Sequence, residues 1–240
     1  MAIQNFLYKR EIEIPNKDFI RIQVPSVGQV VDNEESYYHL VQLLTAMPID
    51  MMVDLDQAGI DWTEITDYQL FLNLFGAFQQ MDTSLVFGDL DLKLFHYAED
   101  METGKPILLD VLHDRKINQA DYRNIAYILR KIHGFKKDTR KPANAEGKRY
   151  MLERAKEKRK RRRGRVSDSQ LEELIVAMVN SEQYHYGFEG TRELSIYQFN
   201  QCVQQVVRKN NYNNRMIGIY AGTVNAKELS TSELNWLSNK

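Results

Sequence analysis

Apolar and polar side chains alternate along two short stretches near the start of the chain, residues 6–14 and 19–24. Alternation with a period of two is typical of half-buried strands, and the Pro-Asn-Lys-Asp sequence between the stretches favours a turn. The pattern therefore predicts that a β-hairpin begins the protein.

The apolar spacing then changes to three and four residues, which is typical of amphipathic helices. One helix is expected from Glu34, and a second has Pro48 in its first turn and ends at Gly59. Thr66 or Asp67 is expected to cap a third helix. Its broad apolar stripe, the expected centre of the N-terminal core, comprises Leu70, Phe71, Leu74, Phe75 and Phe78.

A second hairpin is predicted by the apolar runs 92–97 and 106–112, because polar residues suited to a turn lie between them. Asn118 or Asp121 then begins a helix with apolar residues at helical spacing, and Gly134 ends it. The polar, basic residues that follow are typical of a connector rather than a packed element.

The C-terminal third has the pattern of a small helical module. Ser167 or Asp168 is expected to begin one helix, and Ser195, with a glutamine three residues later, has the spacing of a capping box. Two further short segments are expected around residues 215–220 and 230–236.

Taken together, these elements predict an α+β fold that is predominantly helical, with small antiparallel hairpins, a long basic helix and a helical C-terminal module. We expect an acidic α+β domain over residues 1–135, a basic linker and helix over residues 136–166, and the module over residues 167–240. A chain of 240 residues with 43% hydrophobic side chains is long and apolar enough to bury a substantial core.

Charge is distributed unevenly, although the whole chain has a formal charge of only −1. Residues 1–114 hold 20 acidic and 6 basic side chains, whereas residues 115–165 hold 5 acidic and 20 basic side chains. Such asymmetry between segments indicates interaction with charged partners more directly than the near-neutral total does.

The strongest local feature is the run from Lys148 to Arg165, which holds eleven basic residues and two acidic ones. Its first half still contains apolar side chains, so it can rest against a core, whereas its second half must meet water or an anion. The predicted contacts to an anionic partner are Lys156, Lys158, Arg159, Lys160, Arg161, Arg162, Arg163 and Arg165.

Three partners are compatible with this basic helix, besides its being a solvated surface helix. Its cations can bind nucleic-acid phosphates, although no aromatic residue for base stacking lies between Met151 and Arg165. They can also meet the acidic half of the same chain or of a neighbouring copy, or an acidic partner protein. Protein contact and a solvated face together are favoured over nucleic acid.

A second candidate surface contains Met51 and Met52, beside the acidic Asp50, Asp54 and Asp56. Methionine adapts to irregular partner surfaces, so these two residues are a candidate groove for a partner helix. The competing and favoured interpretation is that they are ordinary core residues.

The sequence indicates no enzyme, and we expect no catalytic, cofactor-binding or metal-binding residues. A set of acidic and histidine residues invites comparison with a metal centre: Asp89, Asp91, His96, Asp110, His113 and Asp114. Their spacing matches none of the zinc or calcium motifs, so we interpret them as loop residues. Gly88 is interpreted as a turn glycine, and Cys202 as a buried small hydrophobic residue without an activating base.

The chain is expected to function in a reducing cytoplasm. Cys202 is the only cysteine, so no disulfide can form within the chain. Residues 1–8 do not have the pattern of a signal peptide, and no apolar run approaches the roughly 20 residues of a membrane helix.

Six blocks of the sequence carry a resemblance to a known group of proteins: residues 46–65, 81–92, 140–155, 169–183, 197–203 and 218–237. Together they are similar to morphogenesis proteins of tailed phages and prophages of Gram-positive bacteria, encoded near the tail-tube and tape-measure genes. Many proteins of that group are tail assembly chaperones, which hold the tape-measure protein and recruit tail-tube subunits.

The resemblance implies a non-enzymatic protein that binds other virion proteins in the host cytoplasm during assembly, as a tail assembly chaperone or a tail-associated structural protein retained in the virion. The expected partners are the tape-measure protein, the tail tube or a second copy of the chain, and no membrane. The alternative is a nucleic-acid-binding protein that uses the basic helix of residues 148–165.

Overall fold

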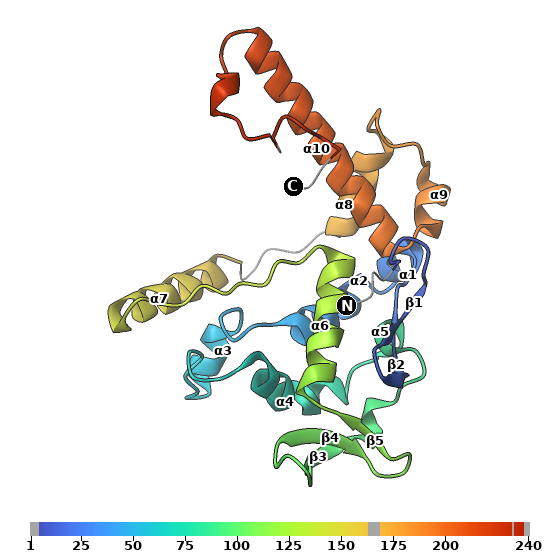
Figure 1. Cartoon of the computed structure of the whole chain (residues 1–240), viewed down its shortest axis with the longest axis vertical. Coiled ribbons are helices and arrows are strands. Elements are labelled where there is room, and N and C mark those ends of the chain that lie inside the picture. Colours follow the sequence, from blue (N-terminus) through green and yellow to red (C-terminus); the bar gives the residue numbers. More distant parts are fainter. Residues whose placement is uncertain (1–4, 163–168, 232, 238–240) are drawn as a thin grey trace.

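The computed structural model describes residues 5–162, 169–231 and 233–237, and the side chain of Arg162 is not among the features described. These residues form ten α-helices and two antiparallel sheets of two and three strands, so the predicted α+β, mainly helical class is confirmed. Both sheets and helices α1–α6 form the body of the molecule, while α7 and α10 project from it in different directions (Figure 1).

The first hairpin forms as predicted from β1 (Glu11–Ile14) and β2 (Lys17–Gln23), which pair antiparallel. Asn16 occupies the turn with a φ of 62°, a left-handed conformation that asparagine tolerates better than most residues. The inward side chains of the hairpin, Ile12, Ile14, Ile20 and Ile22, are completely or almost completely buried.

Three longer helices share one core with this hairpin, α2 (Glu34–Thr45), α4 (Asp67–Phe78) and α6 (Gln119–His133), and α6 contacts both of its strands. Thr66 and Asn118 form complete capping boxes at the starts of α4 and α6, and Gly134 ends α6 with a φ of 68°. The predicted starts of these three helices and the predicted stop of α6 are therefore confirmed.

The helix expected from Pro48 begins later, as α3 (Met52–Gln57). Its predicted first turn consists instead of tight turns, in which the Asp50 and Met51 N–H groups donate to the carbonyls of Met47 and Pro48. The Asp50 carboxylate accepts the Met47 N–H at 2.8 Å and so stabilises the turn against the helix.

The second sheet contains a strand that the apolar pattern did not predict. It consists of β3 (His96–Glu99), β4 (Pro106–Asp110) and β5 (Arg115–Ile117), in the order β3-β4-β5. Residues 92–94, predicted as strand, form a 3-10 turn because the Asp91 carboxylate accepts the Lys93 N–H at 2.9 Å. Two short helices were also not predicted, α1 (Val27–Val31) and α5 (Ser84–Phe87).

The C-terminal helices share the core of the N-terminal part. They are α8 (Gln170–Val179), α9 (Phe188–Glu193) and α10 (Ile196–Tyr220). The Val27 N–H donates to the Leu194 carbonyl at 2.8 Å, and the Ile196 N–H donates to the Pro25 carbonyl at 2.9 Å. Ile196 and Phe199 are completely buried in the same hydrophobic cluster as the first hairpin. The division at residues 135 and 166 stays a prediction.

Helix α10 is longer than expected, because residues 215–220 continue it rather than forming a separate segment. The capping box at Ser195 is confirmed, whereas α8 is capped by Ser169, whose hydroxyl accepts the Glu172 N–H at 2.9 Å. The alternative caps Ser167 and Asp168 lie outside the described residues. After the short turn Ala226–Glu228, the described residues of the segment 230–236 form turns.

Candidate partner-binding surfaces

The basic helix, α7 (Ala145–Arg162), lies across α3 and the loop that follows it. Its side chains at positions 148, 151, 152, 155, 156 and 159 face α3, and we call this set the inner face. The spacing is that of one helix face, so a single helix brings both its apolar residues and some of its cations onto the acidic part of the chain.

Three ion pairs join the inner face to acidic residues of the α3 region. Lys156 Nζ lies 2.9 Å from Asp56 Oδ2, and Arg159 Nη1 lies 2.6 Å from Asp54 Oδ1. Lys148 donates a hydrogen bond to Asp61, and this bond, with those from Thr63, lowers the pKa of the Asp61 carboxyl to about 2. Two of the predicted partner contacts, Lys156 and Arg159, therefore have acidic partners within the chain.

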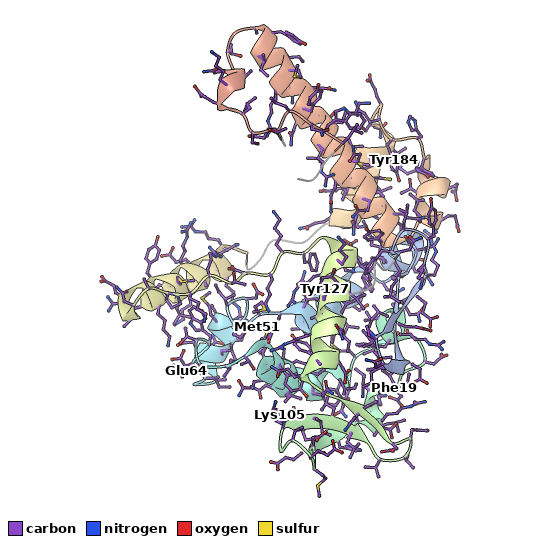
Figure 2. The ribbon with its side chains drawn as sticks, viewed as in Figure 1. Phe19, Met51, Glu64, Lys105, Tyr127 and Tyr184 are labelled. Atoms are coloured by element: carbon purple, nitrogen blue, oxygen red, sulfur yellow. The ribbon has the colours of Figure 1, made fainter. Side chains whose placement is uncertain are left out.

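Apolar contacts reinforce these ion pairs. Met151, Leu152 and Ala155 are half-buried against a second hydrophobic cluster, which consists of Ala46, Ile49, Met52, Val53, Leu55, Trp62 and Leu70. Met52 is 8% exposed, and Met51 is half-buried where α3 and α7 meet (Figure 2). The surface predicted as a groove for a partner helix is thus covered in part by the chain's own α7.

The basic and aromatic side chains of α7 outside the inner face are Arg149, Tyr150, Arg154, Lys158, Lys160 and Arg161, and we call this set the outer face. All six side chains are exposed. Arg161 Nη2 lies 3.8 Å from Glu157 Oε2, and the Arg161 side chain is 82% exposed. The other four cations form no ion pair within the described part of the chain. Arg163 and Arg165 lie outside the described residues.

An open cleft of about 1210 Å³ runs between α7 and α3. Tyr150, Arg154 and Lys158 line it from successive turns of α7, and Arg140 lines it from the connector, where its Nε lies 2.9 Å from Asp138 Oδ1. Tyr150 was not among the predicted site residues. Its spacing of four from Arg154 and eight from Lys158 is the sequence signal that could have identified it.

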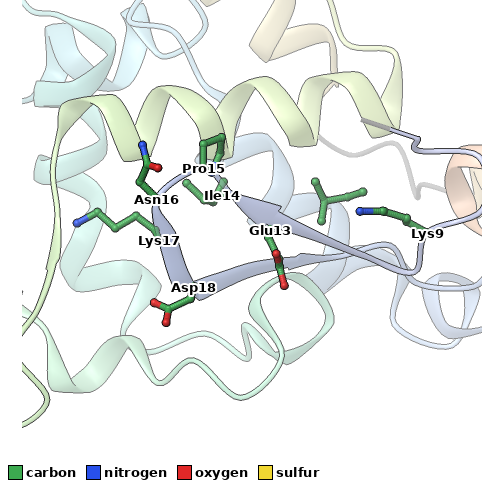
Figure 3. Close-up of a pocket in the computed structure, with 8 residues that line it drawn as sticks. Lys9, Glu13, Ile14, Pro15, Asn16, Lys17 and Asp18 are labelled. Carbon is green, nitrogen blue, oxygen red and sulfur yellow. The ribbon is translucent and has the colours of Figure 1, made fainter. Parts of the chain in front are cut away.

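A shallower hollow of about 470 Å³ lies on the first hairpin (Figure 3). The polar side chains around it diverge, with Lys9 at one end, Lys17 at the other and Asp18 below. Lys17 Nζ donates to the Lys116 carbonyl at 2.9 Å and so ties the two sheets together. Side chains that diverge in this way do not assemble a ligand site.

The acidic and histidine residues considered as a metal centre shape turns. Asp110 is 1% exposed, its Oδ2 lies 2.7 Å from His113 Nδ1, and its Oδ1 accepts the Leu112 N–H at 3.1 Å. Asp91 caps the 3-10 turn, and Asp114 takes a φ of 50° before β5. Among the described residues, no group of three or more His, Cys, Asp or Glu side chains is arranged to hold a metal ion. His96 and Asp89 are exposed.

Two titratable groups are buried or half-buried, one at the end of α6 and one on α10. His133 lies at the end of α6, and its Nε2 is hydrogen-bonded to the Tyr37 hydroxyl at 3.0 Å. Burial lowers the pKa of the His133 imidazole to about 4. Cys202 is half-buried at the core boundary, where burial raises the pKa of its thiol. Gly88, with a φ of 60°, follows α5 in the predicted turn.

Residues 158–240 match the family model described as the YomV second domain, a phage and prophage type of family from Bacillus. The match covers the last residues of α7 and the whole of α8–α10, and this similarity is consistent with a phage protein. No curated protein and no solved structure matches the chain. None of the helices in the described residues is long and apolar enough to cross a membrane.

Proposed function

We propose that this chain is a non-enzymatic phage morphogenesis protein that binds other virion proteins, as a tail assembly chaperone or as a tail-associated structural protein. The similarity of residues 158–240 to a phage domain family supports the phage context. The observation that carries a binding role is the division of α7 into two faces of different chemistry.

The inner face of α7 is matched within the chain, because Lys148, Lys156 and Arg159 each have an acidic partner. The outer face holds exposed cations whose helix is already fixed in place by the inner face. A partner with an acidic surface therefore meets pre-positioned charges, which orient the complex and accelerate encounter more than they add affinity. We propose that this partner is the tape-measure or tail-tube protein.

The test is a pull-down of the tape-measure and tail-tube proteins of the same phage at physiological salt. The variant replaces Arg154, Lys158, Lys160 and Arg161 with Ala and leaves the inner face intact. We expect it to lose capture of at least one of the two proteins. The control replaces Lys105, Lys131 and Lys227, exposed lysines outside α7, with Ala, and it should capture them normally. Equal capture by both variants would exclude the outer face as the contact.

A second candidate function is nucleic-acid binding, and the position of Tyr150 favours it. Tyr150 is 63% exposed and lies one helical turn from Arg154 and two from Lys158, along one cleft. An aromatic ring beside a row of cations is the arrangement that binds single strands, by base stacking and phosphate contact.

Binding of nuclease-treated protein to random single- and double-stranded oligonucleotides, measured across a salt series, separates the two functions. Retained binding near physiological salt, lost in Tyr150→Ala and in the outer-face variant, would support the nucleic-acid function. The logarithm of the binding constant should then fall with slope of about −0.7 per single-strand phosphate neutralised. Binding that disappears at that salt, or is equal in all variants, would leave protein contact as the function of α7.

A further inference from the structure

The far half of α10, residues 207–220, projects beyond the body of the molecule (Figure 1). The near half of the same helix is anchored in the core by Phe199 and by Val206, which is 9% exposed. Because this half of α10 lies beyond the core, no element of the body covers it. Its two sides differ in chemistry.

One side is covered by the segment that returns along the helix after residue 220. Lys209 Nζ lies 5.5 Å from the centre of the Trp236 ring, and the Gln205 side chain donates to the Trp236 carbonyl at 3.2 Å. Arg215 Nη2 lies 3.4 Å from Glu233 Oε1. The charged side chains of this half of α10 thus point toward the return segment or its margin.

The other side presents Val207, Asn210, Asn214 and Ile217, which we call the α10 stripe. Val207 is 52% exposed and Ile217 is 66% exposed, and both asparagines are exposed. The residues follow one another at intervals of three, four and three, the heptad spacing at which two helices pair. The neighbouring positions that would flank such a pairing are Gln204, Asn211, Asn213 and Tyr220, all uncharged.

The order of the α10 stripe is self-complementary. In a parallel pair of helices, each residue of the stripe meets the same residue of the other copy. In an antiparallel pair centred on Tyr212, Val207 meets Ile217 of the other copy, and Asn210 meets Asn214. Apolar side chains therefore face apolar ones in either direction. Asparagine faces asparagine, and its amide both donates and accepts a hydrogen bond, so each pair satisfies itself.

We propose that the α10 stripe binds the α10 stripe of a second copy of this chain and forms a twofold dimer. The absence of charge across the stripe and its flanks removes the like-charge repulsion that self-pairing of charged surfaces would meet. Polar asparagine at pairing positions lowers stability but selects the register, as a single buried asparagine does in coiled coils.

The dimer is a weak one by the size of the contact. The stripe spans about three helical turns, about 16 Å of helix, and half of its pairing positions are polar. Isolated helices of this length do not pair stably, but here the core and the return segment already hold the helix folded, so association orders little new structure. This contact is independent of α7 and of the proposed function.

The test uses two oppositely charged double variants of the full chain, Asn210→Lys with Asn214→Lys and Asn210→Glu with Asn214→Glu. Like charges meet in either homodimer and opposite charges meet in the mixed dimer, whether the helices are parallel or antiparallel. Mass is measured by sedimentation equilibrium over a concentration series that extends to about 100 μM, where a weak dimer forms. The matched controls carry the same charges at Asn73 and Ala77, exposed positions four apart on α4.

The unmodified chain and both controls are expected to dimerise equally. For each stripe variant alone, the dissociation constant of the dimer should rise at least about a hundredfold. An equimolar mixture of the Lys and Glu stripe variants should recover the dimer. Circular dichroism checks that all variants are folded. The proposal is overturned if the unmodified chain stays monomeric over the whole series. It is equally overturned if folded stripe variants associate as the controls do.

Discussion

Helices α7 and α10 both extend from the body of the protein, but they are held by different forces (Figure 1). Helix α7 is held through three ion pairs and half-buried apolar residues, and its free face is basic. Helix α10 is held by completely buried residues at its start, and its free side is uncharged. Surface ion pairs contribute little to stability and weaken with salt, whereas burial of a large apolar side chain contributes more and is not screened by salt. The two helices should therefore respond differently to mutation, pH and salt.

The largest expected difference concerns the anchor of α10. Phe199 is completely buried, and its ring centre lies 6.3 Å from that of Tyr184. Phe199→Ala should lower the free energy of unfolding by about 3–5 kcal/mol, because it removes a large buried side chain and leaves a cavity. Urea unfolding followed by circular dichroism measures this change. Val207→Ala on the exposed side of the same helix should cost less than about 0.5 kcal/mol. Similar losses at both positions would mean that the core does not hold α10.

Acid should weaken the packing of α6 on α2 at His133 before it affects the ion pair of α7 at Asp61. His133 has a folded pKa of about 4, below its ordinary value of 6.5, so the unfolded chain takes up the proton first as pH falls. Stability is therefore lost as pH falls from 6.5 toward 4, by about 3 kcal/mol. Asp61, with a pKa of about 2, contributes stability that is lost only below the ordinary carboxyl range.

The measurement is the urea midpoint as a function of pH, compared with His133→Gln, whose amide can still bond the Tyr37 hydroxyl. This variant should lose most of the dependence between pH 6.5 and 4. An unchanged pH profile in the variant would assign the acid sensitivity to other groups and remove His133 from the comparison.

The smallest expected effect is the coupling between Asp54 and Arg159, whose side chains are 47% and 46% exposed. A double-mutant cycle with Asp54→Ala and Arg159→Ala should give about 0.2–1 kcal/mol in dilute buffer, and less at high salt. Hydrogen exchange of the α7 amides should accelerate with salt, while that of residues 196–206 stays constant. A salt-independent coupling of several kcal/mol would show that α7 is held as rigidly as α10.

Much of the secondary structure depends on interactions between neighbouring residues, and these parts could be predicted. The capping boxes at Thr66, Asn118 and Ser195 join residues three apart, and the stop at Gly134 needs only a residue that accepts a positive φ. The alternating first hairpin carries its own register, because a one-residue slip would expose every buried isoleucine.

Other parts of the candidate surfaces depend on residues far apart in the chain. The sequence shows that residues 148–165 are basic, but which cations face Asp54, Asp56 and Asp61 depends on how α7 lies on α3. The exposed position of Tyr150 beside Arg154 follows from the same docking.

By itself, the sequence determined the fold class, several helix ends, the charge asymmetry between segments and the basic character of α7, since each of these depends on composition or on near neighbours. Tertiary structure alone decided that part of the basic helix is neutralised within the chain and that residues 208–214 stay helical beside Trp236. It also decided that the α10 stripe remains uncovered. The physical reason is that burial and ion pairing depend on distance in space, which a one-dimensional pattern does not contain.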